Sequence, residues 1–271
     1  MESDLENILF LRKPYKAKFI MVDGLDGAGK GFVADCIAKY FEDEGLKVYD
    51  LRKLEEKMNY LPEFNEIEDY NVFIFKEPTS IGIGKDLREE IFKKHNDRSY
   101  NVRTQAMAFS IQREILYKRL VIKALFSMNY VVAERGFITS LVFQPLYSEF
   151  KNEKPKFKVD DILGLEGNKI AMNFMPNYFL ITDCDVKEAI NRLNIREKKD
   201  KAIYETYEFQ KILRDVYLGN KKIFVKGKHT TLKDFLEREG KIYETKYCLI
   251  TTEGTLKDTE RRVFEFLHKN K

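Results

Sequence analysis

The chain has 271 residues, enough for one α/β domain with additional segments. Hydrophobic residues make up 44% of it and charged residues 34%, and no apolar run approaches the roughly 18 residues that a membrane-spanning helix needs. We therefore expect a cytoplasmic protein with a sizeable core and no membrane partner. The net charge of +4 does not by itself indicate nucleic-acid binding, so nucleic acid is not an expected partner. The cysteines are few and far apart in sequence, which indicates free thiols in a reducing compartment.

Apolar runs bounded by polar or turn residues predict the strands. Five of them are clear, at residues 18–22, 72–75, 130–133, 178–182 and 247–251, and a weaker sixth at 47–51 is a candidate to pair beside them. Helical spacing of apolar residues predicts helices at 30–44, 105–127, 186–196 and 255–269. Alternating strands and helices, with strands apolar on both sides, predict a three-layer α/β/α sandwich around a central parallel five-stranded sheet.

A glycine-rich loop follows the first predicted strand and leads directly into the first predicted helix. Its residues are Gly24, Leu25, Asp26, Gly27, Ala28, Gly29, Lys30 and Gly31. Glycines allow successive backbone N–H groups to point inward, where they can bind phosphate together with the helix N-terminus and the Lys30 ammonium. Strand, loop, lysine and helix in this order predict a P-loop that binds ATP.

The residues after the lysine depart from the usual P-loop. Gly31 and Phe32 stand there, so the Ser or Thr hydroxyl that commonly binds Mg²⁺ is missing. We therefore expect water and acidic groups to hold the metal, with Asp26 and Glu134 as the candidates.

Further polar residues follow the later strands. Lys76, Glu77 and Pro78 come after the second clear strand, and the third ends in Glu134-Arg135-Gly136, followed by Phe143-Gln144. The helix at 105–127 carries Phe109 and, four residues on, Arg113, so both lie on one helix face. Because ligands of open α/β sheets bind at the carboxyl ends of the strands, we expect these residues to lie near the P-loop.

This ordered set resembles the thymidylate kinase family. The matching elements are the P-loop Asp26, the Glu77-Pro78 pair, Phe109 with Arg113, the Glu134-Arg135 pair, and Phe143-Gln144. The resemblance covers most of residues 17–217 together with the last strand and helix. Three departures stand out: Lys76 replaces an arginine, Glu134 replaces an aspartate, and Gly136 replaces an aromatic residue or histidine, which would leave space beside the acceptor.

The resemblance implies roles for these residues. Phe109 would stack on a pyrimidine ring, Arg113 and Arg135 would hold the acceptor monophosphate, and Phe143 and Gln144 would line the base pocket, with Glu77 and Pro78 also in the acceptor site. Asp26 would contact the sugar hydroxyl or organise the metal. Arg192 and Arg196, one helical turn apart, would belong to a basic helical lid that closes over ATP. The catalytic set would be Lys30, Asp26, Arg135, Glu134, Arg192 and Arg196.

The sequence therefore predicts a single P-loop kinase domain over 1–271, with a core at about 17–217 and 246–271 and insertions at about 52–70, 146–173 and 221–246. The activity expected from the resemblance is transfer of the ATP γ-phosphate to a deoxynucleoside monophosphate, foremost dTMP, by a homodimer. Two alternatives stay open. One is a deoxynucleoside kinase with Glu77 as general base, and the other is a non-catalytic nucleotide-binding protein, which the missing hydroxyl motivates.

Overall fold

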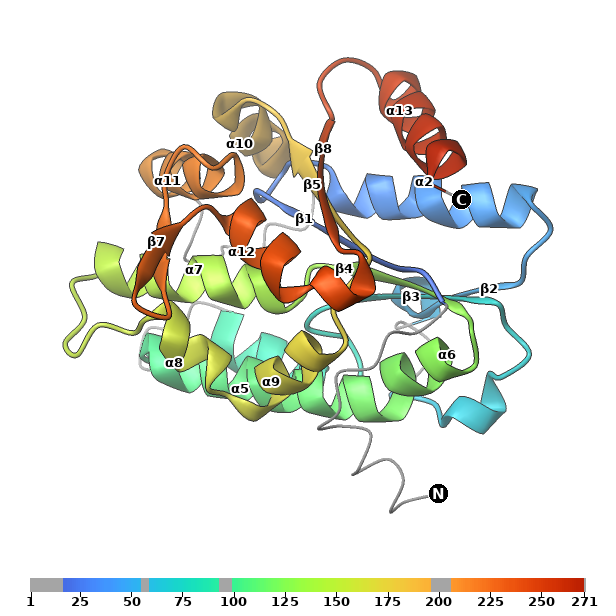
Figure 1. The fold of residues 1–271 in the computed structure, drawn as a ribbon, viewed down its shortest axis with the longest axis horizontal. Helices are drawn as coiled ribbons and strands as arrows, with labels where there is room; N and C mark the ends of the chain where they lie inside the picture. Colours follow the sequence, from blue (N-terminus) through green and yellow to red (C-terminus); the bar gives the residue numbers. More distant parts are fainter. Residues whose placement is uncertain (1–16, 55–58, 93–98, 196–205, 271) are drawn as a thin grey trace.

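A parallel sheet forms the centre of the computed structural model, which describes residues 17–54, 59–92, 99–195 and 206–270 (Figure 1). Within these residues the sheet has six strands in the order β2-β3-β4-β1-β5-β8, every neighbouring pair parallel. The strands are β1 (Phe19–Gly24), β2 (Val48–Asp50), β3 (Val72–Lys76), β4 (Tyr130–Glu134), β5 (Tyr178–Asp183) and β8 (Lys246–Thr251). The architecture is thus the predicted α/β sandwich.

The sheet has one strand more than the five we expected. The additional strand, β2, pairs with β3 in the register Val48↔Val72 to Asp50↔Ile74. It is only three residues long and ends in an aspartate, so its sequence lacks the long apolar run that marks the other strands. The weaker sixth candidate therefore occupies one edge of the sheet.

Helices cover both faces of the sheet (Figure 1). On one face lie α2 and α13, which also pack against each other, and on the other lie α5, α6, α7 and α9. The longer helices are α2 (Lys30–Asp43), α5 (Val102–Leu116), α7 (Phe137–Phe150), α9 (Glu166–Asn173), α10 (Val186–Ile195), α11 (Tyr207–Tyr217), α12 (Leu232–Glu239) and α13 (Leu256–Lys269). The shorter ones are α3 (Leu51–Leu54), α4 (Ile83–Leu87), α6 (Ile122–Phe126) and α8 (Val159–Leu163), with π-helical turns at Arg88–Phe92 and Tyr117–Val121 and 3₁₀ turns at Phe64–Glu66 and Lys241–Tyr243.

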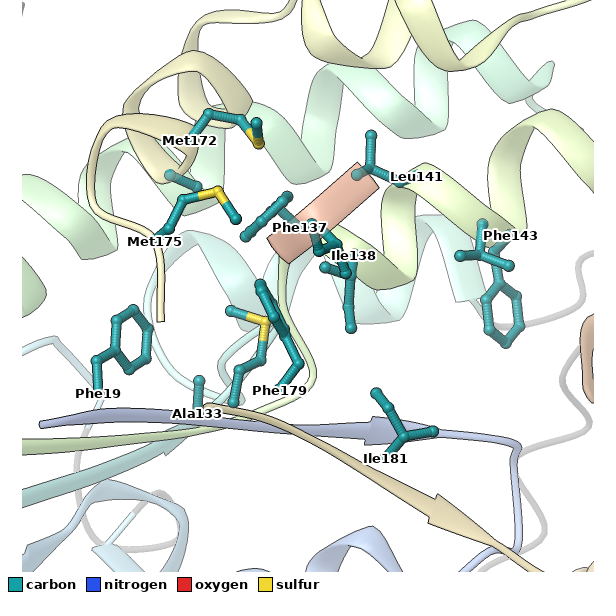
Figure 2. Close-up of a cluster of buried hydrophobic side chains, with 14 of the residues drawn as sticks. Phe19, Ala133, Phe137, Ile138, Leu141, Phe143, Met172, Met175, Phe179 and Ile181 are labelled. Carbon is teal, nitrogen blue, oxygen red and sulfur yellow. The ribbon is translucent and has the colours of Figure 1, made fainter. Parts of the chain in front are cut away.

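Each face of the sheet has its own apolar core, because neighbouring residues of a strand point to opposite faces. In β1, Phe19 and Met21 belong to one core and Ile20 and Val22 to the other. Figure 2 shows part of the first core, where side chains of α7 such as Phe137 pack over strand residues such as Phe179. Burial on both faces explains why the strands are apolar throughout.

The segments predicted as insertions contain regular structure where they are described. Residues 146–173 include the end of α7 and the whole of α8 and α9, and residues 221–246 form a hairpin of β6 (Ile223–Val225) and β7 (Lys228–Thr230), followed by α12. Their assignment as insertions into a single domain stays a prediction. In the part of the chain that the structure describes, no helix is long and apolar enough to cross a lipid bilayer.

Candidate active site

The P-loop lies between β1 and α2, at the carboxyl edge of the sheet. Gly24, Gly27 and Gly29 have φ angles of 139°, 81° and 80°, which favour glycine. A Cβ on Gly24 would lie 2.4 Å from the Thr182 carbonyl oxygen, and one on Gly27 only 2.1 Å from that of Ala189. Gly24 and Gly27 are therefore required for two reasons. Their backbone conformation favours glycine, and β5 comes close to Gly24 while α10 comes close to Gly27.

The Lys30 side chain is buried against this loop. Its Nζ donates hydrogen bonds to the carbonyl oxygens of Gly24 (3.1 Å) and Leu25 (2.5 Å) and lies 3.8 Å from Asp26 Oδ1. Burial, together with the positive charge of Arg135, lowers the pKa of Lys30 to about 8. The lysine is thus held in place by backbone acceptors, at the position where the sequence predicts a phosphate.

Asp26 and Arg135 form an ion pair beside Lys30. An Nη2 hydrogen of Arg135 is donated to Asp26 Oδ1, and the Arg135 backbone N–H donates to the Val22 carbonyl at 2.8 Å. Arg135 has a φ of 67°, unusual for a non-glycine residue, and these contacts hold it there. Burial acts to raise the pKa of Asp26, but the charges of Arg135 and Lys30 outweigh it and lower the pKa to about 2. Asp26 is therefore an anion between two cations.

A second acid, Asp23, lies fully buried at the end of β1 and was not among the predicted site residues. Its Oδ1 accepts hydrogen bonds from the Gly24 N–H (2.8 Å) and the Tyr217 hydroxyl (3.1 Å), and its Oδ2 accepts from the Thr139 hydroxyl (2.6 Å). Burial raises its pKa against the opposing effect of Arg135 and Lys30. The sequence signal was present, since this aspartate directly precedes the first P-loop glycine.

Glu134, at the end of β4, lies beside Gly31 and is paired with Arg52. Both carboxylate oxygens lie 3.6 Å from the point where a Cβ of Gly31 would be. Nη1 of Arg52 donates to Glu134 Oε2 at 3.2 Å and to the Gly31 carbonyl at 3.3 Å. The structure therefore places Glu134 beside the P-loop, where its metal-binding role stays a prediction, and adds an arginine that the sequence did not indicate.

Among the predicted acceptor residues, Arg113 and Glu77 are brought together, and the Arg113 side chain is only 3% exposed. Its Nε donates to Glu77 Oε2 at 2.7 Å, Nη1 to Asn168 Oδ1, and Nη2 to the Ser140 hydroxyl at 3.3 Å. Burial raises the pKa of Glu77, and Arg113 opposes that rise. Asn168 comes from α9 and joins the site through a contact that the sequence did not predict.

Several buried polar atoms of this region have no hydrogen-bond partner within the described residues. They are Oε1 of Glu77, Oε1 of Gln144 and the hydroxyl oxygen of Tyr117. Phe109 and Phe143 are both nearly buried, 8% and 7% exposed. Because unpaired buried polar atoms are costly, they mark places where a bound polar molecule would be stabilised.

Pro78 and Gly136 also belong to the predicted acceptor region, and the acceptor role of Pro78 stays a prediction. Pro78, after the cis peptide bond Glu77–Pro78, accepts hydrogen bonds from Arg88 through its carbonyl oxygen. The expectation that Gly136 leaves space beside the acceptor is wrong. A Cβ there would lie 2.4 Å from the Met21 Cε atom, so the methionine of β1 fills that space.

The predicted lid is only partly described. Arg192 of α10 donates to Glu188 (2.9 Å) and to the hydroxyl (3.1 Å) and carbonyl (2.9 Å) of Thr252, and the Thr252 hydroxyl donates to the P-loop carbonyl of Ala28 at 3.1 Å. Arg192 is thus linked to the P-loop through one residue. Arg196 lies outside the described residues.

Helix α11, which was not predicted, sends polar side chains to the same edge. Arg214 forms a bidentate ion pair with Asp183 at the end of β5, with distances of 2.7 and 3.0 Å, and Tyr217 contacts Asp23. Within the described residues, no group of three or more His, Cys, Asp or Glu side chains could hold a metal ion by itself. A metal here would need phosphate oxygens and water among its ligands, as Mg²⁺ in kinases commonly does.

The sequence profile of thymidylate kinase matches residues 57–234, about two thirds of the chain. The chain belongs to the thymidylate kinase family. The profile match begins after the P-loop, so the P-loop assignment rests on its own sequence and geometry.

Two curated thymidylate kinases and one solved structure show how similar such proteins are to this chain. A probable thymidylate kinase of Thermococcus gammatolerans is 26% identical over 214 residues, covering 76% of this chain and 84% of that protein. The thymidylate kinase of Buchnera aphidicola is 23% identical over 204 residues, covering 75% and 82%. The solved structure of thymidylate kinase from Candida albicans covers 95% of this chain and 94% of its own, with a TM-score of 0.59 at 16% identity. At that identity the structural likeness supports the fold alone.

Proposed function

We propose that this thymidylate kinase family member transfers the γ-phosphate of ATP to dTMP, giving dTDP. The observation that carries the proposal is the position of Arg135, which follows β4 and pairs with Asp26 of the P-loop after β1, the neighbouring strand. A partly exposed guanidinium there can grip a phosphate between an ATP bound to the loop and an acceptor beside it. Phosphoryl transfer needs mainly such positioning and charge neutralisation.

On the donor side, the P-loop amides and Lys30 would bind the β- and γ-phosphates, and Arg192, with Arg196 of the lid, would neutralise charge above them. ATP would bind with Mg²⁺, held by the phosphates, water, Glu134 and Asp26. Asp26 is paired with two cations, Arg135 and Lys30, whereas Glu134 is paired with Arg52 and lies beside Gly31, where the usual P-loop hydroxyl would be. The metal would supply charge neutralisation for the transferred phosphoryl group.

On the acceptor side, Phe109 and Phe143 would contact the thymine ring, and Gln144 would hydrogen-bond its polar edge. The unpartnered oxygens of Gln144 and Glu77 support this, because a bound nucleotide offers N–H and O–H donors. Arg113 reaches Glu77, Asn168 and Ser140 with one hydrogen bond each from Nε, Nη1 and Nη2. A guanidinium has five N–H donors, so Arg113 retains capacity for the acceptor.

An assay of purified protein with ATP, Mg²⁺ and a panel of acceptors tests the proposal. The panel should hold dTMP, other deoxynucleoside monophosphates and thymidine. We expect dTDP from dTMP and no phosphorylation of thymidine. Formation of dTMP from thymidine would instead favour a deoxynucleoside kinase, and ATP binding without any product would favour a non-catalytic role.

We infer that the protein acts as a homodimer in the cytoplasm. Met107 and Ile111, four residues apart on α5, are 49% and 51% exposed and form an apolar strip on the outer side of that helix. A second copy of the chain would cover it. The three cysteines are free thiols, as a reducing compartment requires.

A further inference from the structure

Two buried oxygens near Arg113 have no hydrogen-bond partner within the described residues. They are Oε1 of Glu77, a residue only 4% exposed, and the hydroxyl oxygen of Tyr117, which is fully buried. An unpaired buried hydroxyl is unfavourable, and phenylalanine at this position would bury the same ring without it. The Tyr117 hydroxyl therefore indicates a task other than stabilising the fold.

Tyr117 begins a π-helical turn inside one continuous helix. Helix α5 runs directly into this turn, which in turn runs into α6. Arg113 lies four residues before Tyr117, so the two side chains share a helix face. The Tyr117 ring packs edge-on against Phe19 of β1, with 6.5 Å between the ring centroids. Single π-helical turns of this kind are frequent at functional sites.

The Tyr117 hydroxyl and the Glu77 carboxylate belong to the same buried cluster. Arg113 Nε donates to Glu77 Oε2 at 2.7 Å, so Oε1 is the oxygen left over. Burial raises the pKa of Tyr117 well above its usual value, the charge of Glu77 raises it further, and Arg113 opposes the rise. Such electrostatic effects require that the hydroxyl lie close to the Glu77–Arg113 pair. A donor and an acceptor, both unpaired, are thus neighbours.

Tyr117 is the donor best suited to serve Glu77. Of the buried side-chain atoms without a partner in the described part of the chain, two carry a hydrogen: the Tyr117 hydroxyl and Nε of Arg119. The Arg119 guanidinium donates through Nη2 to the Leu61 carbonyl (2.5 Å) and to Glu63 Oε1 (2.6 Å). Arg119 is therefore directed at residues 61–63 and away from Glu77.

The charge balance of the cluster shows when such a donor matters. The Glu77 carboxylate is compensated by Arg113, and a buried carboxylate that loses its partner is strongly unfavourable. A nucleotide that binds to Arg113 shares the charge of the guanidinium and so weakens this compensation. A further hydrogen bond to Oε1 offsets that loss in a place where bulk water cannot.

We propose that Tyr117 is a positioning residue of the acceptor site, whose hydroxyl donates to Glu77 Oε1 when the acceptor binds to Arg113. Tyr117 acts through Glu77 and Arg113 and does not touch the nucleotide. A carboxylate oxygen can accept two hydrogen bonds, so Oε1 can also accept one from the nucleotide. The inference rests on the proposed function, because it needs a nucleoside monophosphate at Arg113.

Tyr117→Phe tests this role, because it removes the hydroxyl and keeps the ring. Calorimetric titration should show dTMP binding weakened about tenfold, which corresponds to one hydrogen bond to a charged group. Binding of adenylyl imidodiphosphate, a non-hydrolysable ATP analogue, should be unchanged. The midpoint of urea denaturation without dTMP should not fall, because no existing hydrogen bond is lost. A purely structural hydroxyl would give the opposite pattern.

Two further variants sharpen the test. Tyr178→Phe is the matched control, since Tyr178 is a buried tyrosine at the amino end of β5, at the opposite edge of the sheet, and it should leave dTMP affinity unchanged. In a Glu77→Gln background there is no carboxylate to support, so Tyr117→Phe should cost less than about threefold there. Circular dichroism checks that each variant is folded.

The possible results separate the inference from the proposed function. If the unmodified protein binds dTMP and Tyr117→Phe binds it equally well, the inference is wrong and the proposed function stands. An equal loss with and without Glu77→Gln also overturns the inference, because Tyr117 would then act independently of Glu77. No dTMP binding by the unmodified protein would contradict both.

Discussion

At the scale of single residues, the P-loop places a lysine where it is charged at neutral pH but loses its charge easily. Burial is the main cause, and the backbone carbonyls that accept its hydrogen bonds do not compensate fully. A triphosphate at the loop favours the ammonium form, so binding of ATP and protonation of Lys30 support each other.

This coupling predicts that ATP affinity falls as the pH rises above about 8, the pKa of Lys30 in the ATP-free protein. Below that pH the ammonium is already formed, and above it ATP binding must take up a proton, which weakens affinity by up to about tenfold per pH unit. Calorimetric titration of ATP at several pH values between neutral and alkaline measures this fall in affinity. Lys30→Ala should abolish catalysis and lack this pH dependence. A flat affinity in the unmodified protein would contradict the prediction.

Asp23 gives a second prediction at this scale. Tyr217→Phe removes one of the three hydrogen bonds to a fully buried carboxylate, so it should lower the free energy of unfolding by about 1–2 kcal/mol. Urea denaturation at neutral pH measures the change. Tyr207→Phe, on the exposed side of the same helix, should have little effect, and equal effects of the two substitutions would refute the role given to Tyr217.

The sequence predicted the P-loop and most residues around it because local order specifies them: strand, glycines, lysine and helix lie within a few positions. Arg52 and Asn168 could not be found in the same way. Arg52 contacts Glu134 from 82 residues away, and Asn168 contacts Arg113 from 55. Neither belongs to a motif, and only tertiary packing brings them to the site.

At the scale of elements, the buried strands were the most predictable part, since each is an apolar run with clear boundaries. Helix α7 was missed because it is apolar on nearly all sides and contains Pro145, so it shows neither a polar face nor a clear continuation. Helix α11 was missed although Phe209, Leu213 and Val216 have helical spacing and are buried. That pattern would have predicted it.

The contact of α9 with α5 allows a prediction for an element. A Cβ on Gly167 would lie 1.9 Å from the Ser110 carbonyl oxygen, so Gly167→Ala must push α9 away from α5. We expect a loss of roughly 2–3 kcal/mol in the free energy of unfolding, measured by urea denaturation. Because α9 carries Asn168, the displacement should also raise the KM for the acceptor.

Gly164 provides the matched control, since it lies just before α9 in a helical conformation with φ of −72°. A Cβ there would approach nothing closer than the Asp161 carbonyl oxygen at 3.4 Å. Gly164→Ala should therefore leave stability within about 0.5–1 kcal/mol of the unmodified protein. Similar losses for both glycines would show that helix propensity, and not the α5–α9 contact, governs the response.

At the scale of the whole molecule, the sheet separates two apolar cores and gathers the functional residues at the carboxyl ends of its strands. Sequence alone predicted this arrangement in outline, because alternating strands and helices leave few topologies open. It did not predict that β2 joins as a sixth strand, since three residues carry too little pattern.

The proposed homodimer makes a prediction at this scale. Light scattering coupled to size-exclusion chromatography should give about twice the subunit mass of 32.1 kDa. Ile111→Glu places a charge in the apolar strip of α5 and should shift the protein to the subunit mass, whereas Leu256→Glu, at an exposed leucine of α13, should not. A dimer that persists in Ile111→Glu would place the interface elsewhere.

Thr252 connects the P-loop to the far end of the chain, with a consequence for synthesis in the cell. Its hydroxyl donates to the Ala28 carbonyl across 224 residues of sequence. At translation rates of about 5–20 residues per second, the ribosome needs roughly 10–45 s after making Ala28 before it makes this donor. A nascent polypeptide therefore lacks this support of the P-loop until nearly the whole sequence has been made.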